Sequence, residues 1–203
     1  MNQSVKNEKA ILYVHGKGGT AQEAEHYKSL FPEYDVFGMD YKYFTPWETK
    51  GEIYNEVESL HKKYSEIILI ANSIGALFSM NAQIEGLITK AYFISPIVNM
   101  EKLITNMMMW ANVTEAELKE KQTIETTFGE TLSWEYLTYI RNNPIHWNVQ
   151  TSILYGTKDN LTTLETVTEF AQKHNAKLTV MDGGEHWFHT AEQMKFLNNW
   201  IIT

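Results

Sequence analysis

Six apolar runs of strand length alternate with helical patterns along most of the chain, and this alternation limits the possible folds more than any other feature. The runs cover residues 10–14, 35–39, 67–71, 91–95, 151–155 and 177–181. Between the second and third runs, Ile53, Val57 and Leu60 recur at the spacing of one helical face. Alternating strands and helices are typical of a parallel sheet wound on both faces. We therefore predict an α/β fold with a doubly wound, mostly parallel sheet of about six strands.

Three short patterns of the form Thr-x-x-Glu/Gln mark expected helix starts. They are Thr20–Glu23, Thr162–Glu165 and Thr190–Gln193. In such a capping box, the first and last side chains each accept a hydrogen bond from a backbone N–H at the start of the helix. The second pattern makes Thr162 the expected N-cap, which leaves the nearby Asp159 free for another role.

The composition bounds the size and class of the protein. A chain of 203 residues naturally forms one domain, which we place over residues 1–203. The net charge of −8 argues against a nucleic-acid partner, because phosphates need a basic surface. The absence of cysteine excludes disulfides, thiolate metal sites and a thiol nucleophile. Because the N-terminus is polar and no apolar stretch is long enough to span a bilayer, we expect a cytoplasmic protein without a membrane partner.

One segment, residues 97–149, interrupts the alternation after the fourth strand-like run. Leu103, Met107 and Trp110 share a helical spacing, and a second stripe begins at Trp134. A structureless loop of this length is unusual inside a compact domain. We therefore predict a helical insertion over 97–149.

A serine follows the third strand-like run at a point where the chain must turn sharply. The run Glu66–Ile70 leads into Ala71-Asn72-Ser73-Ile74-Gly75, and an apolar helical pattern comes next. Small residues on either side of a serine allow a tight turn from strand to helix, and the turn exposes the hydroxyl at the end of the sheet. The backbone N–H of Ile74 would then open the helix and face an oxyanion formed beside Ser73. Ser73 is therefore a candidate nucleophile.

Candidate partners for Ser73 follow three other strand-like runs. Asp159 comes after the fifth run and His186 after the sixth, while His15-Gly16-Lys17-Gly18-Gly19 comes after the first. With these residues the chain resembles the α/β hydrolases, which have the order Ser…Asp/Glu…His and a glycine-rich oxyanion loop. The resemblance covers about residues 10–200.

The resemblance implies a role for each of these residues. Ser73 would be the nucleophile, His186 the general base and then the acid, and Asp159 the residue that orients His186. The backbone N–H groups of Lys17 and Ile74 would form the oxyanion hole, with His15 bracing the loop.

Two further features bear on the resemblance. Ala71 stands where the family more often has glycine, and the family's usual first hairpin is missing, so we interpret the chain as a small member. The insertion lies where the family often carries a lid. Met108, Trp110 and Trp134 are therefore candidate substrate-binding residues, although the same residues can equally form the insertion's own core. In that case we expect the pocket near Tyr41, Tyr43 and Trp47 after the second run.

Other assignments remain open at this point. His189 is the rival base, and Asp182 and Glu185 are fallback acids that lie close in sequence to His186. His186 and His189 also have a spacing seen in zinc sites, but no third ligand of the usual kind lies nearby, so we predict no metal.

A dinucleotide-binding protein is the competing class. Gly16-x-Gly18-x-x-Ala21 follows a strand-like run and precedes a helical pattern, and Asp40 ends the next run where a ribose-binding acid can lie. This interpretation leaves the Ser, Asp and His residues unexplained.

The sequence thus favours a cofactor-free serine hydrolase that cleaves carboxylic esters through an acyl-enzyme, with a small-molecule ester as its partner. Thioesterase, amidase and acyltransferase activities share the same chemistry, and a non-catalytic ligand-binding member is a further alternative. Specificity depends on the shape of the pocket, so the sequence does not identify the substrate or the acyl-chain preference. Nor does it indicate the oligomeric state or any movement of the insertion.

Overall fold

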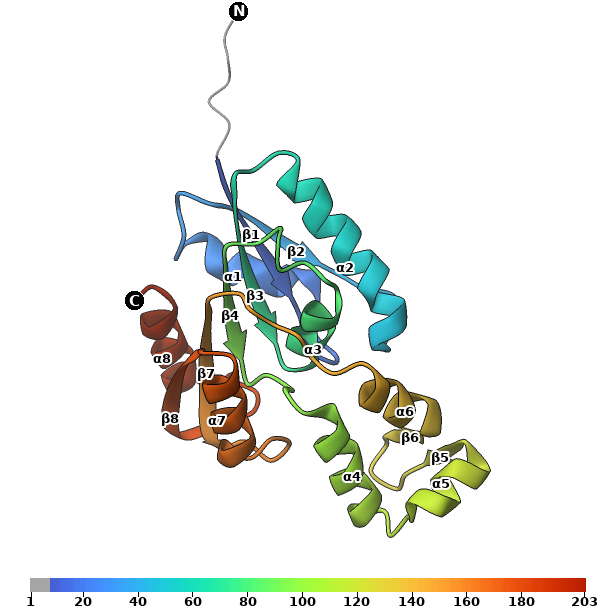
Figure 1. Ribbon diagram of the computed structural model, residues 1–203. Helices are drawn as coiled ribbons and strands as arrows, with labels where there is room; N and C mark the ends of the chain where they lie inside the picture. The colour runs from blue at the N-terminus through green and yellow to red at the C-terminus, as the bar shows by residue number, and fades with distance from the viewer. Residues whose placement is uncertain (1–7) are drawn as a thin grey trace, which may run out of the picture. The chain divides into compact units, whose positions relative to one another are not determined.

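A six-stranded parallel sheet forms the core of the larger of two compact units (Figure 1). The computed structural model describes residues 8–203. The strands are β1 (Lys9–Val14), β2 (Asp35–Met39), β3 (Glu66–Asn72), β4 (Lys90–Ile94), β7 (Thr151–Lys158) and β8 (Lys177–Glu185). Their order across the sheet is β2-β1-β3-β4-β7-β8, and every neighbouring pair is parallel. The predicted fold class is therefore confirmed.

Apolar side chains on both faces explain why the strands read as nearly continuous apolar runs. All but the first residue of β1, and five consecutive residues of β3, are buried. Ile11, Tyr13, Ile68 and Ile70 project to one face. On that face they pack in one cluster with residues of η1 (Ala21–Ala24), α1 (Glu25–Lys28) and α8 (Ala191–Ile201).

The remaining helices of this sheet are α2 (Pro46–His61), α3 (Ile74–Asn81) and α7 (Leu164–Lys173). The chain moves from β1 to β2 in one direction and then crosses back past β1 to β3. Because such crossovers are right-handed, the reversal places α2 and the later crossover helices on the face opposite to α1. Ile53, Val57 and Leu60 of α2 are buried, as their spacing predicts.

The reversal also fixes where a ligand can approach. In open α/β sheets, ligands bind outside the carboxyl ends of the strands, where the strand order reverses. Here that point lies between β1 and β3, so the loops after residues 14 and 72 border it. The order differs from the 3-2-1-4-5-6 arrangement typical of dinucleotide-binding domains, because the second strand lies at the edge.

Two local predictions are corrected by the structure. The N-cap of α7 is Thr163, whose side chain accepts from the Thr166 N–H, and not Thr162. Strand β8 extends to Glu185, well beyond the predicted 177–181. It stays paired with β7 because two glycines let the backbones approach: a Cβ on Gly156 would lie 2.3 Å from the carbonyl oxygen of Gly184.

The chain divides into two compact units, one containing the sheet and the other formed by Asn99–Ile145. The second unit contains α4 (Met100–Trp110), α5 (Glu115–Lys121), β5 (Thr123–Glu125), β6 (Thr131–Ser133) and α6 (Trp134–Asn142). Arg141 forms ion pairs with Glu101 and Glu115 at 2.7 Å each, which link its three helices. We predicted helices in this region but not the antiparallel β5–β6 hairpin, because two strands of three residues carry almost no alternating pattern.

None of the described helices is both long enough and apolar enough to cross a membrane.

Candidate active site

Ser73 occupies the turn between β3 and α3, and its backbone is held in an unusual conformation. Its φ is 53° and its ψ is −120°, backbone angles that residues other than glycine rarely adopt. Two backbone hydrogen bonds hold this conformation: the Ser73 N–H donates to the Ile94 carbonyl at 2.9 Å, and the Ile97 N–H donates to the Ser73 carbonyl at 3.1 Å. Strained residues of this kind cluster at functional sites, where the surrounding structure enforces them.

Small residues around Ser73 are required by close backbone contacts. A Cβ on Gly75 would lie 2.5 Å from the His15 carbonyl oxygen and 2.6 Å from that of Val14. A Cβ on Gly16 would lie 3.0 Å from the Cβ of Ser73. The turn after β3 and the loop after β1 therefore touch each other, as two loops at the same edge of the sheet can.

Ser73, His186 and Asp159 form a continuous chain of hydrogen bonds. The Ser73 Oγ lies 2.8 Å from His186 Nε2, and His186 Nδ1 lies 2.7 Å from Asp159 Oδ2. Because a carboxylate can only accept, His186 donates through Nδ1, and its Nε2 is left to accept from the serine hydroxyl. The strands place the three residues together: Ser73 follows β3, Asp159 follows β7 and His186 follows β8.

The Asp159 carboxylate is held in place by backbone hydrogen bonds in addition to its bond with His186. Its side chain is fully buried, and its Oδ1 accepts from the N–H groups of Leu161 at 2.8 Å and Thr162 at 3.0 Å. These two bonds direct the second oxygen at His186, whose side chain is only 15% exposed. Thr162 thus contributes its backbone to the aspartate rather than its side chain to the helix.

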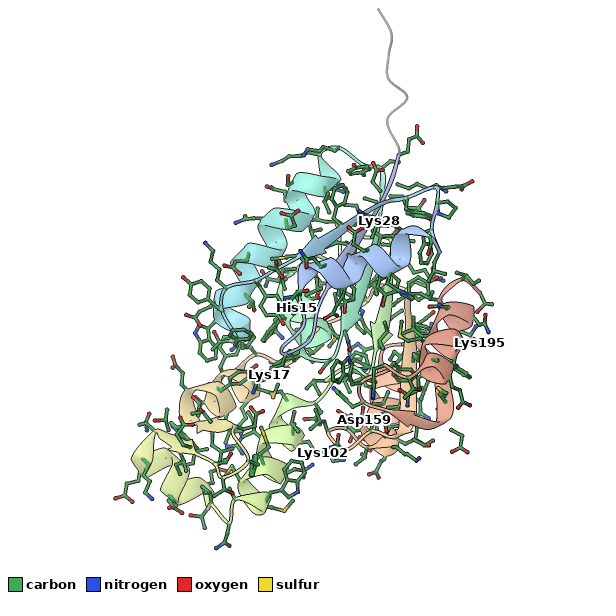
Figure 2. The ribbon with its side chains drawn as sticks, turned by 180° about the vertical axis from the view of Figure 1, so that it is seen from behind. His15, Lys17, Lys28, Lys102, Asp159 and Lys195 are labelled. Atoms are coloured by element: carbon green, nitrogen blue, oxygen red, sulfur yellow. The ribbon has the colours of Figure 1, made fainter. Side chains whose placement is uncertain are left out.

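The loop after β1 carries a peptide whose orientation is set by two donors (Figure 2 labels His15, Lys17 and Asp159). The Gly16 carbonyl accepts from His15 Nδ1 at 2.7 Å and from the Gly19 N–H at 3.1 Å. In a trans peptide the carbonyl and the following N–H point in opposite directions. The Lys17 N–H is therefore directed away from the His15 ring.

His15 is itself held firmly. Its ring is buried and stacks on Tyr41 with 4.3 Å between centroids, and the Tyr41 hydroxyl donates to the His15 carbonyl at 3.0 Å. Asp40 Oδ1 lies 3.5 Å from His15 Nε2 and accepts from the Ala21 N–H at 2.7 Å. Asp40 thus braces the loop from the side, whereas the dinucleotide-binding interpretation assigned it to a ribose.

The second candidate oxyanion donor lies directly after the serine. Ile74 is the first residue of α3, so its N–H has no carbonyl partner within the helix. Gly16 touches Ser73, and Lys17 is the next residue along the loop. Both peptide groups predicted for the oxyanion hole therefore belong to segments that adjoin Ser73, and their catalytic role stays a prediction.

The rival residues have other partners. His189 is exposed, with Nδ1 lying 2.5 Å from the Trp187 carbonyl and 3.6 Å from Glu185. Asp182 accepts from the Thr157 hydroxyl at 3.0 Å. Among residues 8–203, no group of three or more histidine, aspartate or glutamate side chains is arranged to hold a metal ion.

The three predicted substrate-binding residues lie in the second unit, and their role stays a prediction. Met108 is buried, whereas Trp110 is 54% exposed and meets Phe128 edge-on at 6.2 Å. Trp134 is partly buried, with the Lys119 ammonium 5.8 Å from its ring centroid.

One polar cluster beside the serine was missed from the sequence. The Tyr13 hydroxyl donates to Glu23, and Asn72 lies near it on the same face of the sheet, two residues beyond the β3 partner of Tyr13. The one signal in the sequence was Glu23, the last residue of a capping box. The capping pattern, however, does not indicate which strand residue the glutamate side chain contacts.

Comparison by sequence finds no matching family model and no matching curated protein. Solved structures do match. Est1E from Butyrivibrio proteoclasticus has a TM-score of 0.76 at 16% identity, over 98% of this chain and 87% of that chain. The α/β hydrolase domain-containing protein 10 from mouse has a TM-score of 0.74 at 15% identity, over 95% and 87%. The Pyrococcus furiosus esterase Pf2001 has a TM-score of 0.66 at 20% identity, over 96% and 80%.

At these identities the likeness concerns the fold, and it agrees with the resemblance that the residues suggested. Three features of this chain agree with that likeness: the order of the strands, the strained serine after β3 and the loop after β1. This chain therefore has the α/β-hydrolase fold.

Proposed function

We propose that this chain is a serine hydrolase that cleaves carboxylic esters through an acyl-enzyme intermediate. The observation that carries the proposal is the hydrogen-bonded series from Ser73 Oγ through His186 to Asp159, with distances of 2.8 and 2.7 Å. One of the structures described above, Pf2001 from Pyrococcus furiosus, is named as an esterase, which supports an ester as the substrate class.

In the first half of the reaction, His186 Nε2 takes the hydroxyl proton as Ser73 Oγ attacks the ester carbonyl carbon. The carbonyl oxygen gains a negative charge, which the Lys17 and Ile74 N–H groups stabilise. When the intermediate collapses, the bond from carbon to the alcohol oxygen breaks, and the alcohol leaves with the proton from His186. Asp159 holds the imidazole in the correct tautomer and stabilises its charged form.

In the second half, water replaces the alcohol. His186 removes a proton from the water, whose oxygen attacks the acyl carbon, and the same two N–H groups stabilise the new oxyanion. Collapse returns the proton to Ser73 Oγ and releases the carboxylic acid. The residues need no cofactor for these steps. A cytoplasmic location, expected from the polar N-terminus and the absence of a long apolar stretch, completes the proposal. The small-molecule ester partner follows from the resemblance.

Labelling with a fluorophosphonate and mapping of the modified residue tests the proposal. We expect one equivalent of label on Ser73, and hydrolysis of p-nitrophenyl acetate by the same preparation. Ser73→Ala should lose the label and fall to the background that binding and the oxyanion hole support, about 10³–10⁴-fold over water. Modification of another serine, or full turnover by Ser73→Ala, would show that the nucleophile is assigned wrongly.

A further inference from the structure

A polar cluster formed by Tyr13, Glu23 and Asn72 adjoins the serine turn, because Asn72 directly precedes Ser73. Tyr13 belongs to β1 and is buried, with its ring 5.4 Å from the ring of Tyr27. Its hydroxyl donates to Glu23 Oε2, and Asn72 lies near it on the same face of the sheet, two residues beyond Ile70, the β3 residue that pairs with Tyr13. Burial raises the pKa of Tyr13 well above its usual value, and the nearby Tyr27 and Glu23 raise it further by smaller amounts. The hydroxyl therefore stays protonated at neutral pH and can donate to Glu23.

Glu23 fixes the far end of the loop that follows β1. Its Oε1 accepts from the Thr20 N–H at 3.1 Å. The same oxygen lies against the backbone of Gly19, since a Cβ there would approach it to 2.6 Å. The carboxylate thus anchors residues 19 and 20, while His15 and Gly16 are fixed at the other end of the loop.

Asn72 occupies the opposite end of the cluster. It is the last residue of β3 and is bonded covalently to Ser73. The cluster therefore joins two segments that are far apart in sequence, the loop that carries the Lys17 N–H and the turn that carries the Ile74 N–H. An oxyanion is stabilised only when both donors lie at hydrogen-bond distance from the same point.

We propose that Glu23, Tyr13 and Asn72 are positioning residues that hold the two donors of the oxyanion hole in register. This inference rests on the proposed function. The three side chains touch no reacting atom, so their effect is on the placement of the donors. Loss of one oxyanion donor costs about 10²–10³ in kcat, which sets the upper limit. A shift of about 1 Å in such a group can cost about 10²-fold.

Tyr13→Phe is the first test, because it removes the hydroxyl and keeps the ring that packs on Tyr27. We expect kcat for p-nitrophenyl acetate to fall roughly tenfold or more. KM should change little, because the donors act on charge that develops in the transition state. The rate of labelling of Ser73 should fall in parallel.

Tyr34→Phe is the matched control. The Tyr34 hydroxyl donates to Glu66 Oε1 at 2.8 Å, so the control also removes a tyrosine–glutamate hydrogen bond. Glu66 begins β3, whereas Ser73 follows its end. The Tyr34–Glu66 pair therefore lies at the amino ends of the strands, away from the carboxyl ends where Ser73 lies. We expect Tyr34→Phe to keep the kcat of the unmodified protein, whatever it does to the melting temperature.

A double variant separates placement from general packing. If the cluster acts as one unit, Tyr13→Phe combined with Asn72→Ala should be about as impaired as the worse single variant. Glu23→Gln is the alternative if Tyr13→Phe does not fold. The amide oxygen can keep the bond to the Thr20 N–H, but the amide nitrogen cannot accept from Tyr13, so kcat should again fall with little change in KM.

The outcomes distinguish this inference from the proposed function. If the unmodified protein neither reacts with the fluorophosphonate at Ser73 nor hydrolyses the ester, the proposed function is wrong and the inference falls with it. If the unmodified protein is active and the folded Tyr13→Phe and Glu23→Gln variants keep its kcat, the positioning role is wrong and the proposed function stands.

Discussion

The peptide between Gly16 and Lys17 is oriented by one side chain, that of His15, together with the Gly19 N–H. His15 Nδ1 holds the Gly16 carbonyl at 2.7 Å, and the planarity of the peptide then directs the Lys17 N–H to the other side. The stack on Tyr41 keeps the imidazole in place. His15 therefore acts on the proposed oxyanion hole through geometry, without contact with the reacting atoms.

Two substitutions at His15 separate this hydrogen bond from the packing of the ring. His15→Leu removes the donor, and we expect kcat to fall roughly tenfold or more with little change in KM, within the limit of about 10²–10³ for a lost oxyanion donor. His15→Asn places an amide N–H near the position of Nδ1, so it should recover much of that loss. The measurement is kcat and KM for p-nitrophenyl acetate in both variants.

His174→Leu provides the control for this pair. His174 Nδ1 also bonds a backbone carbonyl, that of Trp147 at 2.8 Å, and its ring lies 4.4 Å from Phe170. It caps the end of α7, so its loss should leave kcat unchanged. Equal damage by His15→Leu and His15→Asn would mean that contact with Tyr41, and not the bond to Gly16, is what matters.

At the scale of whole elements, the serine turn is shaped by the contact between the start of α3 and the end of β1. Gly75 lies in the first turn of α3, against the carbonyl oxygens of Val14 and His15. Glycine weakens a helix interior by about 0.8–1.0 kcal/mol relative to alanine. That cost is accepted here because no other residue fits between the helix and the strand.

Gly75→Ala and Gly51→Ala form a matched pair that tests this contact. Both glycines lie within helices, but a Cβ on Gly51 of α2 would meet no atom within 4 Å. We expect Gly51→Ala to stabilise the protein by roughly 0.4–1 kcal/mol. Gly75→Ala should destabilise it by about 1–3 kcal/mol, because the backbone must shift, and it should also lower kcat by moving Ser73.

Denaturant unfolding of both variants, together with ester hydrolysis, measures the two effects. If Gly75→Ala were as stable as Gly51→Ala and fully active, α3 would have room to move away from β1. The turn would then owe its geometry to the hydrogen bonds of Ser73 with Ile94 and Ile97.

At the scale of the molecule, the sequence predicts what depends on pattern and misses what depends on pairing. The strand runs, their parallel arrangement and the meeting of Ser73, Asp159 and His186 follow from periodicity and from the rule that carboxyl ends share one edge of the sheet. The contact of Tyr13 with Glu23 and Asn72 does not follow, because no pattern shows which side chains meet across elements. The β5–β6 hairpin was missed because its strands are too short to show alternation.

The second unit carries the prediction that remains furthest from a test. Its candidate pocket residues differ in exposure: Met108 is buried and Trp110 is not. Met108→Ala should therefore cost about 2–5 kcal/mol of stability as a cavity in a core, which makes it a poor probe of specificity. Trp110→Ala is the sharper variant, because it removes an exposed ring at the end of α4 and leaves the buried side chains intact.

We expect Trp110→Ala to change the preferred chain length of p-nitrophenyl esters. An apolar pocket distinguishes each methylene by about 1–3 kcal/mol, so kcat/KM ratios between neighbouring esters should shift roughly tenfold or more. Tyr54→Ala, which removes a partly exposed ring from α2, should leave the profile unchanged. An unaltered profile in Trp110→Ala and Trp134→Ala, with both folded and labelled at Ser73, would assign these residues to the unit's own packing. The acyl pocket would then be sought around Tyr43 and Trp47, because Tyr41 next to them already stacks on His15 beside the serine.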